Sequence, residues 1–404
     1  MNFLWGILGI IVVLGIAFLL SSKRKSINPR TILVGLAIQL SFAFVVLEWE
    51  AGRAALQTFA EGVQNIIDYA GEGISFVFGP AANVEEFGFV FAFQVLTIII
   101  FFSSLIAVLY HLGIMQVIIK LLGGLLAKML GTSRPESMSA AANIFVGQTE
   151  APLVVRPFIG NMTQSELFAI MTGGLASVAG STLAGYALLG VPLEYLLAAS
   201  FMAAPAGLIM AKMILPETEE PKHTDPVELE KDEETVNVID AAARGAGVGL
   251  QLALNVGAML LAFIALIALV NGIIGFIGEP FGFGDLTLQG ILGFIFAPLA
   301  FAIGVPWDEA VLAGSFIGQK LVLNEFVAYA AFAPMIEELS PKTVIVVSFA
   351  LCGFANLSSL AILLGGLGGL APSRRPDIAR LGMRAVAAGM LASLLSAAIA
   401  GMFV

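Results

Sequence analysis

A few amide, hydroxyl and carboxyl side chains interrupt segments of the sequence that are otherwise apolar. They are Gln148, Thr149, Glu150, Asn324, Glu325, Asn356 and Ser359. Together they offer hydrogen-bond donors, acceptors and two carboxylates, and Phe354 adds an aromatic face. Such a set suits a neutral, flat, polyhydroxylated solute. It has little to offer an anion, because Lys320 is the only cation close by in its second half.

Buried polar residues also have a structural explanation, because Asn, Ser and Gln side chains often satisfy one another and the ends of helices. For Asn324, Ser358 and Thr182, each considered alone, a structural role and a ligand-binding role are equally good explanations. It is weaker for Glu150 and Glu325, because a carboxylate at the centre of a membrane costs about 2.5 to 3.5 kcal/mol on the insertion scale. We therefore expect these two glutamates to be functional.

Uncharged oxygens close to the same segments indicate a cation site. Asn143 and Ser177 supply side-chain oxygens without a carboxylate, and backbone carbonyls at broken helices add to such sites. Calcium usually recruits several acidic ligands, whereas a weakly bound monovalent ion does not. Sodium is therefore the favoured ion.

The composition places these residues in a membrane protein. Of the 404 residues, 59% are hydrophobic and 12% are charged, against roughly 25% charged in an ordinary soluble domain, which excludes a soluble enzyme. The net charge of −10 argues against nucleic acid as a partner. One cysteine cannot form an internal disulfide, and with only two histidines a zinc or haem site is not expected.

Apolar runs long enough to cross a hydrocarbon core of about 30 Å occur eight times. They cover residues 3–20, 32–47, 90–111, 166–189, 193–214, 250–276, 342–364 and 381–403. If the spans alternate, the basic residues of 23–30 and two later basic clusters fall on one side, which the positive-inside rule identifies as the cytoplasm. We therefore expect a multi-pass protein in the lipid bilayer with its N- and C-termini outside.

Two connecting segments differ from these spans. Residues 50–90 combine spaced apolar residues with acidic ones and are predicted to form an amphipathic helix on the external surface. Residues 216–237 are rich in charge and proline, which predicts a solvated, disordered linker on the cytoplasmic side. Most of the net negative charge lies in this linker, so it says little about the solute.

Residues 137–161 and 306–334 are too polar for simple spans and fit helical hairpins that enter and leave the membrane on one side. Non-helical backbone at a hairpin tip is tolerated where it is buried in protein or lines a wet cavity. Residues 145–148 (FVGQ) are echoed by residues 316–319 (FIGQ), and a span rich in small and polar residues, expected to be broken, follows each hairpin. Hairpins on opposite sides indicate inverted repeats with a binding site at their interface.

Three motifs resemble a known family. Residues 318–329 (GQKLVLNEFVAY) resemble the signature of the concentrative nucleoside transporters around its Asn-Glu-Phe core. Residues 147–152 (GQTEAP) and residues 353–356 (GFAN) with Ser359 are similar to two further motifs of that family. The resemblance covers essentially the whole chain, at bacterial length and without the additional N-terminal spans of animal members.

The resemblance implies an all-α, homotrimeric protein of a bacterial inner membrane, with eight spans and two opposed re-entrant hairpins. It also implies an elevator-like movement of a transport region past a scaffold. Family positions that contact the nucleobase match Gln148, Thr149 and Glu150, and those that contact the ribose match Glu325, Asn356 and Ser359. Phe354 lies where the family packs the nucleoside, Thr182 where it packs the base, and Asn324 and Lys320 are supporting candidates. The family's sodium site matches the side chains of Asn143 and Ser177 and the backbone carbonyls of Val146 and Val178.

This architecture divides the chain into five predicted parts. Residues 1–111 hold spans one to three and the external helix, mainly scaffold, and residues 112–190 hold an interfacial helix, the first hairpin and the broken fourth span. Residues 191–305 hold spans five and six, the linker and an interfacial helix. Residues 306–370 hold the second hairpin and the broken seventh span, and residues 371–404 hold the eighth span.

The predicted function is sodium-coupled import of a uridine-like nucleoside by a secondary active transporter that needs no cofactor and does no covalent chemistry. The closest alternative keeps the fold and couples to protons through Glu150 or Glu325. An organic-acid transporter would need an arginine near a hairpin tip, and Arg156 is the only candidate. An intramembrane enzyme would lack a nucleophile, a metal cluster and a phosphate loop, and a passive channel would not accumulate its solute.

Overall fold

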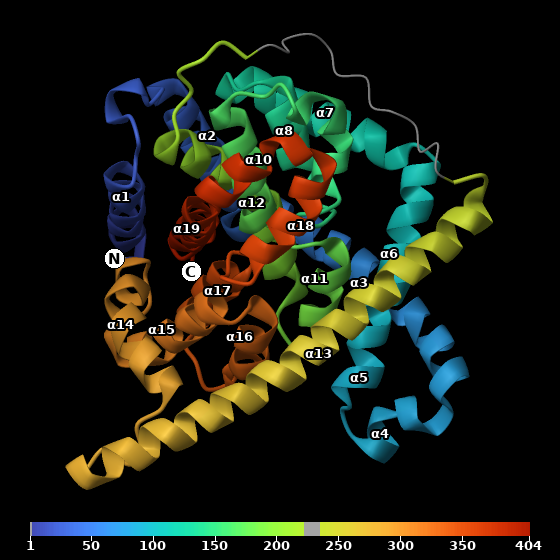
Figure 1. The fold of residues 1–404 in the computed structure, drawn as a ribbon. Helices are drawn as coiled ribbons and strands as arrows, with labels where there is room; N and C mark the ends of the chain where they lie inside the picture. The colour runs from blue at the N-terminus through green and yellow to red at the C-terminus, as the bar shows by residue number, and fades with distance from the viewer. Residues whose placement is uncertain (1, 222–234) are drawn as a thin grey trace.

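The computed structural model describes residues 2–221 and 235–404, so residues 222–234 of the predicted linker lie outside the described residues. Every regular element in these two ranges is helical (Figure 1). The first half contains α1 (Asn2–Leu19), α2 (Pro29–Ala43), α3 (Glu50–Phe78), α4 (Val84–Phe87), α5 (Phe91–Gln94), α6 (Leu96–His111), α7 (Ile114–Leu130), α8 (Arg134–Ala142), α9 (Arg156–Ile159), α10 (Gln164–Ala176), α11 (Gly180–Leu188) and α12 (Leu193–Ile214). The second half contains α13 (Val238–Gly278), α14 (Leu288–Ala302), α15 (Trp307–Val322), α16 (Glu325–Phe332), α17 (Pro341–Leu351), α18 (Ser359–Leu370) and α19 (Arg375–Ala400).

Most predicted spans correspond to single helices. Within the described residues, seven helical segments are long and apolar enough to cross a membrane, or eight if α14 and α15, bent by 116° relative to each other, form one span. The predicted span at 342–364 is not among the seven, because its polar residues divide it into the short helices α17 and α18. α13 is 41 residues long and extends well beyond the predicted run at 250–276.

The fourth and seventh predicted spans are broken where small and polar residues gather. α10 ends at Ala176 and α11 begins at Gly180, whereas α17 ends at Leu351 and α18 begins at Ser359. Each broken span follows a helical pair that we call a hairpin. Hairpin 1 comprises residues 134–159, in which α8 packs against a 3₁₀ helix, and hairpin 2 comprises residues 307–332, in which α15 packs against α16.

Backbone hydrogen bonds connect the breaks to the hairpins and to each other. The three bonds join Gly180 N to Phe145 O (3.0 Å), Phe354 N to Ser177 O (3.1 Å), and Leu357 N to Leu321 O (3.1 Å). The first joins hairpin 1 to the break after α10, the second joins the two breaks, and the third joins the break after α17 to hairpin 2. Groups that the broken helices leave unpaired are thereby partly satisfied.

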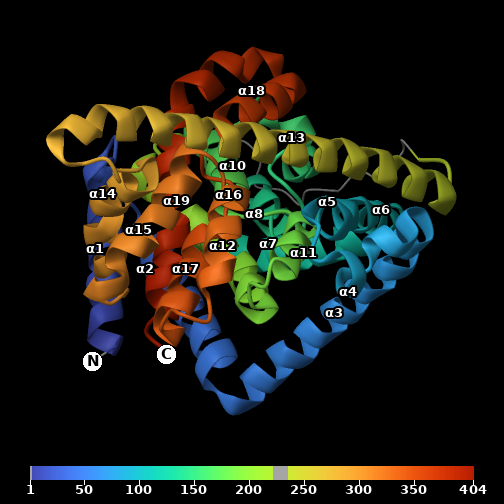
Figure 2. The same cartoon turned by 90° about the horizontal axis from the view of Figure 1, so that it is seen from below.

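The helices form an inner bundle and an outer layer. In the most apolar windows of α10–α11 and α12, 94% of the residues are buried, against 22% for α1 and 11% for α13. Figures 1 and 2 show α13 as a long helix that crosses the outside of the molecule beside α6. The exposed faces of these outer helices are apolar, which suits contact with lipid or with another apolar surface.

The amphipathic helix expected over residues 50–90 is shorter than predicted. α3 ends at Phe78, because Gly79 adopts a φ of 56° and begins a 3₁₀ turn that contains Pro80. Leu56, Ala60 and Ile67 are buried along one face of α3, which agrees with the predicted amphipathic character.

Both ends of the chain lie on one side of the molecule (Figure 1). The Asn2 amide donates a hydrogen bond to the carbonyl of Val404. The two ends of the described chain therefore lie next to each other. Which side of a membrane this is stays a prediction.

Gly389 on α19 allows that helix to approach the end of α10 closely. A Cβ at this position would lie 2.7 Å from the Cβ of Leu175 and 3.0 Å from its carbonyl carbon. We expect Gly389→Ala to destabilise the protein by about 1 to 3 kcal/mol, since overpacking a filled interior forces the helices apart. Thermal unfolding of the purified protein in detergent measures the effect. Gly15→Ala on α1 is the control, because its added Cβ meets nothing within 4 Å; equal melting temperatures for the two variants would contradict the close packing.

Candidate functional site

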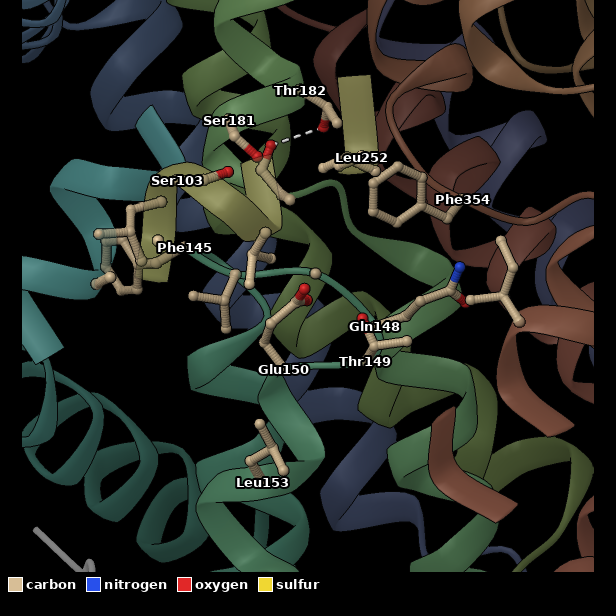
Figure 3. A pocket seen from close by; sticks show the side chains of 18 of the residues that line it. Ser103, Phe145, Gln148, Thr149, Glu150, Leu153, Ser181, Thr182, Leu252 and Phe354 are labelled. Carbon is tan, nitrogen blue, oxygen red and sulfur yellow. Dashed lines mark hydrogen bonds between the residues drawn. The ribbon is translucent and has the colours of Figure 1, made fainter. Parts of the chain in front are cut away.

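The polar residues singled out in the sequence converge on one cavity of about 640 Å³. Hairpin 1, the start of α11, hairpin 2 and the segment that leads into α18 form its walls, and α6 and α13 close it from outside. The predicted binding residues that line it are Gln148, Thr149, Glu150, Thr182, Asn324, Glu325, Phe354, Asn356 and Ser359. Figure 3 shows that Gln148, Thr149 and Glu150 project from consecutive positions of one turn, with Thr182 and Phe354 on other elements around the cavity.

The hairpin 1 side of the cavity presents groups that lack partners. Gln148 is buried, with 6% of its surface exposed, and its Oε1 accepts no hydrogen bond from any residue that the structure describes. Close packing holds this turn in place: a Cβ on Gly174 would lie 2.8 Å from the Cβ of Gln148, and one on Gly366 would lie 2.7 Å from the Cγ2 of Thr149. The turn is therefore rigidly placed, with an amide acceptor free for a ligand.

The hairpin 2 side is organised around the buried carboxylate of Glu325. The Tyr186 hydroxyl donates a hydrogen bond to Oε1 (3.1 Å), and the Asn356 amide donates one to Oε2 (3.2 Å). Each carboxylate oxygen has about two acceptor positions, so both oxygens keep capacity for a further donor. Glu325 thus combines a fixed orientation with free acceptor sites that face the cavity.

Asn324 and Asn356 hold the backbone around this carboxylate. Asn324 Oδ1 accepts from Val327 N (2.9 Å) and caps the first turn of α16, which gives this residue a structural role beside its place in the cavity wall. Asn356 Oδ1 accepts from Ser359 N (2.9 Å) and from the Ser358 hydroxyl (2.7 Å). The start of α18 and the amide that holds Glu325 are therefore parts of one hydrogen-bonded unit.

Two further hydroxyls of the predicted site are bonded to backbone carbonyls. The Thr182 hydroxyl donates to Ala179 O (2.7 Å), the bond drawn in Figure 3. The Ser359 hydroxyl donates to Phe354 O. Because both hydroxyl protons are engaged in these bonds, each oxygen is left with acceptor capacity only.

Tyr186 is a residue of the site that sequence reasoning missed. Its ring is fully buried and packs against Phe326 and Tyr329, with centroid distances of 4.6 and 4.5 Å. It stands behind Glu325 and does not line the cavity. A tyrosine in an apolar helix usually needs a partner for its hydroxyl. This need was the one feature of the sequence that could have indicated a contact between Tyr186 and a polar residue of the site.

The predicted ion ligands come from two adjacent segments, Asn143 and Val146 from hairpin 1 and Ser177 and Val178 from the break after α10. Asn143 is buried, and its amide nitrogen donates to Ser139 O (2.9 Å). Its Oδ1 accepts no hydrogen bond from residues 2–221 or 235–404. The Ser177 hydroxyl donates to Gly173 O (3.1 Å). Within the described residues, the carbonyls of Val146 and Val178 accept no hydrogen bond. A group of unpartnered neutral oxygens beside an unwound helix end fits a monovalent cation.

Lys320 is not part of the cavity wall. It is fully buried behind hairpin 2, where its ammonium donates to Ala350 O (2.7 Å) and Ser393 Oγ (3.1 Å). Arg156 does line the cavity. The cavity wall thus contains all the predicted substrate residues except Lys320, which was a supporting candidate.

Family models match almost the whole chain. The model of the "Na+ dependent nucleoside transporter C-terminus" matches residues 195–401, that of the corresponding N-terminus matches residues 8–81, and that of "Nucleoside recognition" matches residues 92–193. These matches include hairpin 1, hairpin 2 and both breaks.

Individual relatives agree with the family models. The chain is 62% identical to the uncharacterized transporter YutK of Bacillus subtilis, with all of both chains aligned. It is 50% identical to the nucleoside permease NupC of Helicobacter pylori, over 99% of this chain and 98% of that protein. It is 39% identical to the sodium/nucleoside cotransporter 1 of Rattus norvegicus, over 97% of this chain and 62% of the rat protein.

Solved structures share the fold. One described as CNTnw in an inward-facing substrate-bound state aligns with a TM-score of 0.96 at 57% identity, over 100% of this chain and 98% of that one. Another, of a CNTnw variant in an outward-facing state, aligns with a TM-score of 0.97 at 56% identity, over 100% of this chain and 98% of that one. The chain therefore belongs to the concentrative nucleoside transporter family, whose members are membrane transporters and not enzymes.

Proposed function

We propose that this protein imports nucleosides across the cytoplasmic membrane of a bacterium and couples each import to the entry of sodium. The observation that carries the proposal is the convergence of nine predicted binding residues on one cavity, next to the unpartnered Asn143 Oδ1. The family and the relatives named NupC and sodium/nucleoside cotransporter 1 support it.

The two sides of the cavity suit the two halves of a nucleoside. Gln148, Thr149 and Glu150 offer donors and acceptors to the edge of a nucleobase, and Phe354 offers a face on which the ring stacks. Glu325 accepts hydrogen bonds from ribose hydroxyls, because its oxygens retain acceptor capacity after the bonds from Tyr186 and Asn356. Asn356 and Ser359 hold the ribose end in place.

The proposed sodium ligands share backbone with the nucleoside cavity. Val146, whose carbonyl is one of the proposed ligands, lines the cavity, and the Phe354 N–H donates a hydrogen bond to Ser177 O. A sodium ion bound by Asn143, Ser177, Val146 and Val178 would therefore fix the position of Gln148 and of Phe354. Binding of the ion pre-organises the nucleoside site, which is the physical basis of coupling.

The membrane arrangement follows from the same features. We infer that hairpins 1 and 2 are re-entrant from opposite sides in inverted repeats, and the presence of both turns in the wall of one cavity supports this. The compact group of hairpins and broken helices moves as an elevator against the outer helices α6 and α13. The long exposed apolar face of α13 forms part of a trimer interface and scaffold. The termini lie outside.

The direct test is uptake of radiolabelled uridine into proteoliposomes that contain the purified protein. We expect accumulation above the external concentration with an inward sodium gradient, and loss of accumulation when choline replaces sodium at fixed pH. A panel of unlabelled nucleosides should compete, and organic acids should not. Uptake that follows a proton gradient without sodium would show proton coupling, and uptake without accumulation would show a passive pathway.

Tyr186→Phe tests the bond that orients Glu325. The change removes only the hydroxyl, and a hydrogen bond to a charged group contributes about 1.5 to 3 kcal/mol, so we expect uridine to bind at least tenfold more weakly. Tyr69→Phe is the matched control, because Tyr69 is exposed on α3 and should leave affinity unchanged. Affinity for uridine is measured by calorimetry. Wild-type affinity in the Tyr186→Phe protein would show that the bond from Tyr186 does not orient Glu325 for binding.

Asn143→Ala tests the proposed ion site. Loss of its oxygen should raise the sodium concentration for half-maximal uptake at least fivefold, equivalent to about 1 kcal/mol for a lost contact. Sodium titrations of uridine uptake measure this shift. Asn161→Ala, at an exposed position after hairpin 1, should have no effect. If the two variants respond to sodium alike, the ion does not bind where we place it.

A further inference from the structure

Lys320 is a buried cation that lies outside the nucleoside cavity. Its side chain has no exposed surface, it does not line the cavity, and no carboxylate forms an ion pair with it in the part of the chain that the structure describes. A buried charge without an ionic partner is costly unless hydrogen bonds and dipoles compensate it. The compensation must therefore come from the backbone around it.

That compensation lies at the C-terminal end of α17. The Lys320 ammonium donates to Ala350 O (2.7 Å), one residue before the last residue of the helix, and to Ser393 Oγ (3.1 Å). Ser393 Oγ in turn lies 3.2 Å from Cys352 O, in the break itself. The last carbonyls of a helix have no partners within the helix and carry a partial negative charge, so this end favours a cation.

The end of α10 is the counterpart of the end of α17. The two ends are adjacent: a Cβ on Gly353 would lie 2.9 Å from Ala176 O, and α19 packs against both helices (Figure 1). Beside the end of α10, the oxygens of Asn143 and Val146 from hairpin 1 and of Val178 from the break have no hydrogen-bond donor among the described residues. The two equivalent helix ends therefore differ in what lies beside them. Oxygens without a donor lie beside the end of α10, whereas the Lys320 ammonium lies at the end of α17.

The sequence echo between the hairpins agrees with this difference. Residues 145–148 (FVGQ) and residues 316–319 (FIGQ) are followed by Thr149 and Lys320 respectively. Thr149 lines the cavity, whereas Lys320 turns into the protein and reaches α17. Only hairpin 2 thus brings a cation of its own to the helix end beside it.

We propose that Lys320 is a tethered cation that serves the end of α17 as sodium serves the end of α10. This inference rests on the proposed sodium coupling. Lys320 is a positioning residue: it holds the end of α17, and through it the segment that carries Phe354 and Asn356. Because its ammonium already satisfies Ala350 O and Ser393 Oγ, the chain has one exchangeable sodium site where its two helix ends would otherwise offer two.

The test is a sodium titration of uridine uptake in proteoliposomes for the wild-type protein, Lys320→Ala and Lys320→Arg. We expect a Hill coefficient of about 1 for the wild type and for Lys320→Arg, which keeps the charge. Lys320→Ala frees the carbonyls for a second ion, so we expect a Hill coefficient approaching about 2 and a several-fold higher half-activating sodium concentration. Lys342→Ala is the control and should behave as the wild type, because the ammonium of this half-buried lysine lies over the Trp5 ring and donates to Asn2 Oδ1, away from both helix ends.

Several results would overturn the inference. A Lys320→Ala protein with unchanged sodium dependence shows that the ammonium does not stand in for an ion, and a wild-type Hill coefficient of about 2 shows that the second site is already open. A wild type without sodium dependence instead refutes the proposed function, and it is seen before any variant is compared.

A second measurement covers variants that fold poorly. The melting temperature of Lys320→Gln is compared with that of the wild type in sodium chloride and in choline chloride, because a ligand that binds only the native state raises stability with its concentration. We expect sodium to stabilise the variant more than it stabilises the wild type. Equal stabilisation, or neutral variants that stay unfolded at every sodium concentration, would show that sodium cannot replace the ammonium.

Discussion

The need to satisfy backbone groups at broken helices inside the bundle controls this structure. In a membrane there is no water to pair with an orphan carbonyl or N–H, so irregular backbone is tolerated only where protein or a wet cavity covers it. Here the breaks after α10 and α17 lie against each other and against the two hairpins, and three backbone hydrogen bonds join them. Some of the remaining unpaired groups surround the cavity, and we propose that ligands pair with them.

The same constraint explains why the site combines rigid and free groups. Glu325 is fixed by Tyr186 and Asn356, and Asn356 is fixed by the first turn of α18. The Gln148 Oε1 and the Asn143 Oδ1, by contrast, are buried without partners. A buried polar atom without a partner destabilises the unliganded protein, and a nucleoside and an ion would remove that cost.

Much of the site was predictable from the sequence, because polar residues are conspicuous in a chain with 12% charged residues. The repeated FVGQ and FIGQ sequences and the small and polar residues after each hairpin predicted the two breaks. They also predicted that Gln148, Glu325 and Asn356 lie around one site. The roles of Tyr186 and Lys320 could not be predicted, since both depend on contacts between residues more than 25 positions apart. A run of apolar residues also does not reveal where a helix stops, which is why α13 is longer and α3 shorter than expected.

We propose that the ion and the nucleoside share the backbone of the two breaks and therefore bind cooperatively. Calorimetric titration of the purified protein with uridine, with sodium and then with choline at fixed pH, tests this claim most directly. Linkage requires that sodium raise uridine affinity by the same factor by which uridine raises sodium affinity. We expect a factor of at least about 5 in both directions. Uridine affinity that is equal in sodium and in choline would contradict it.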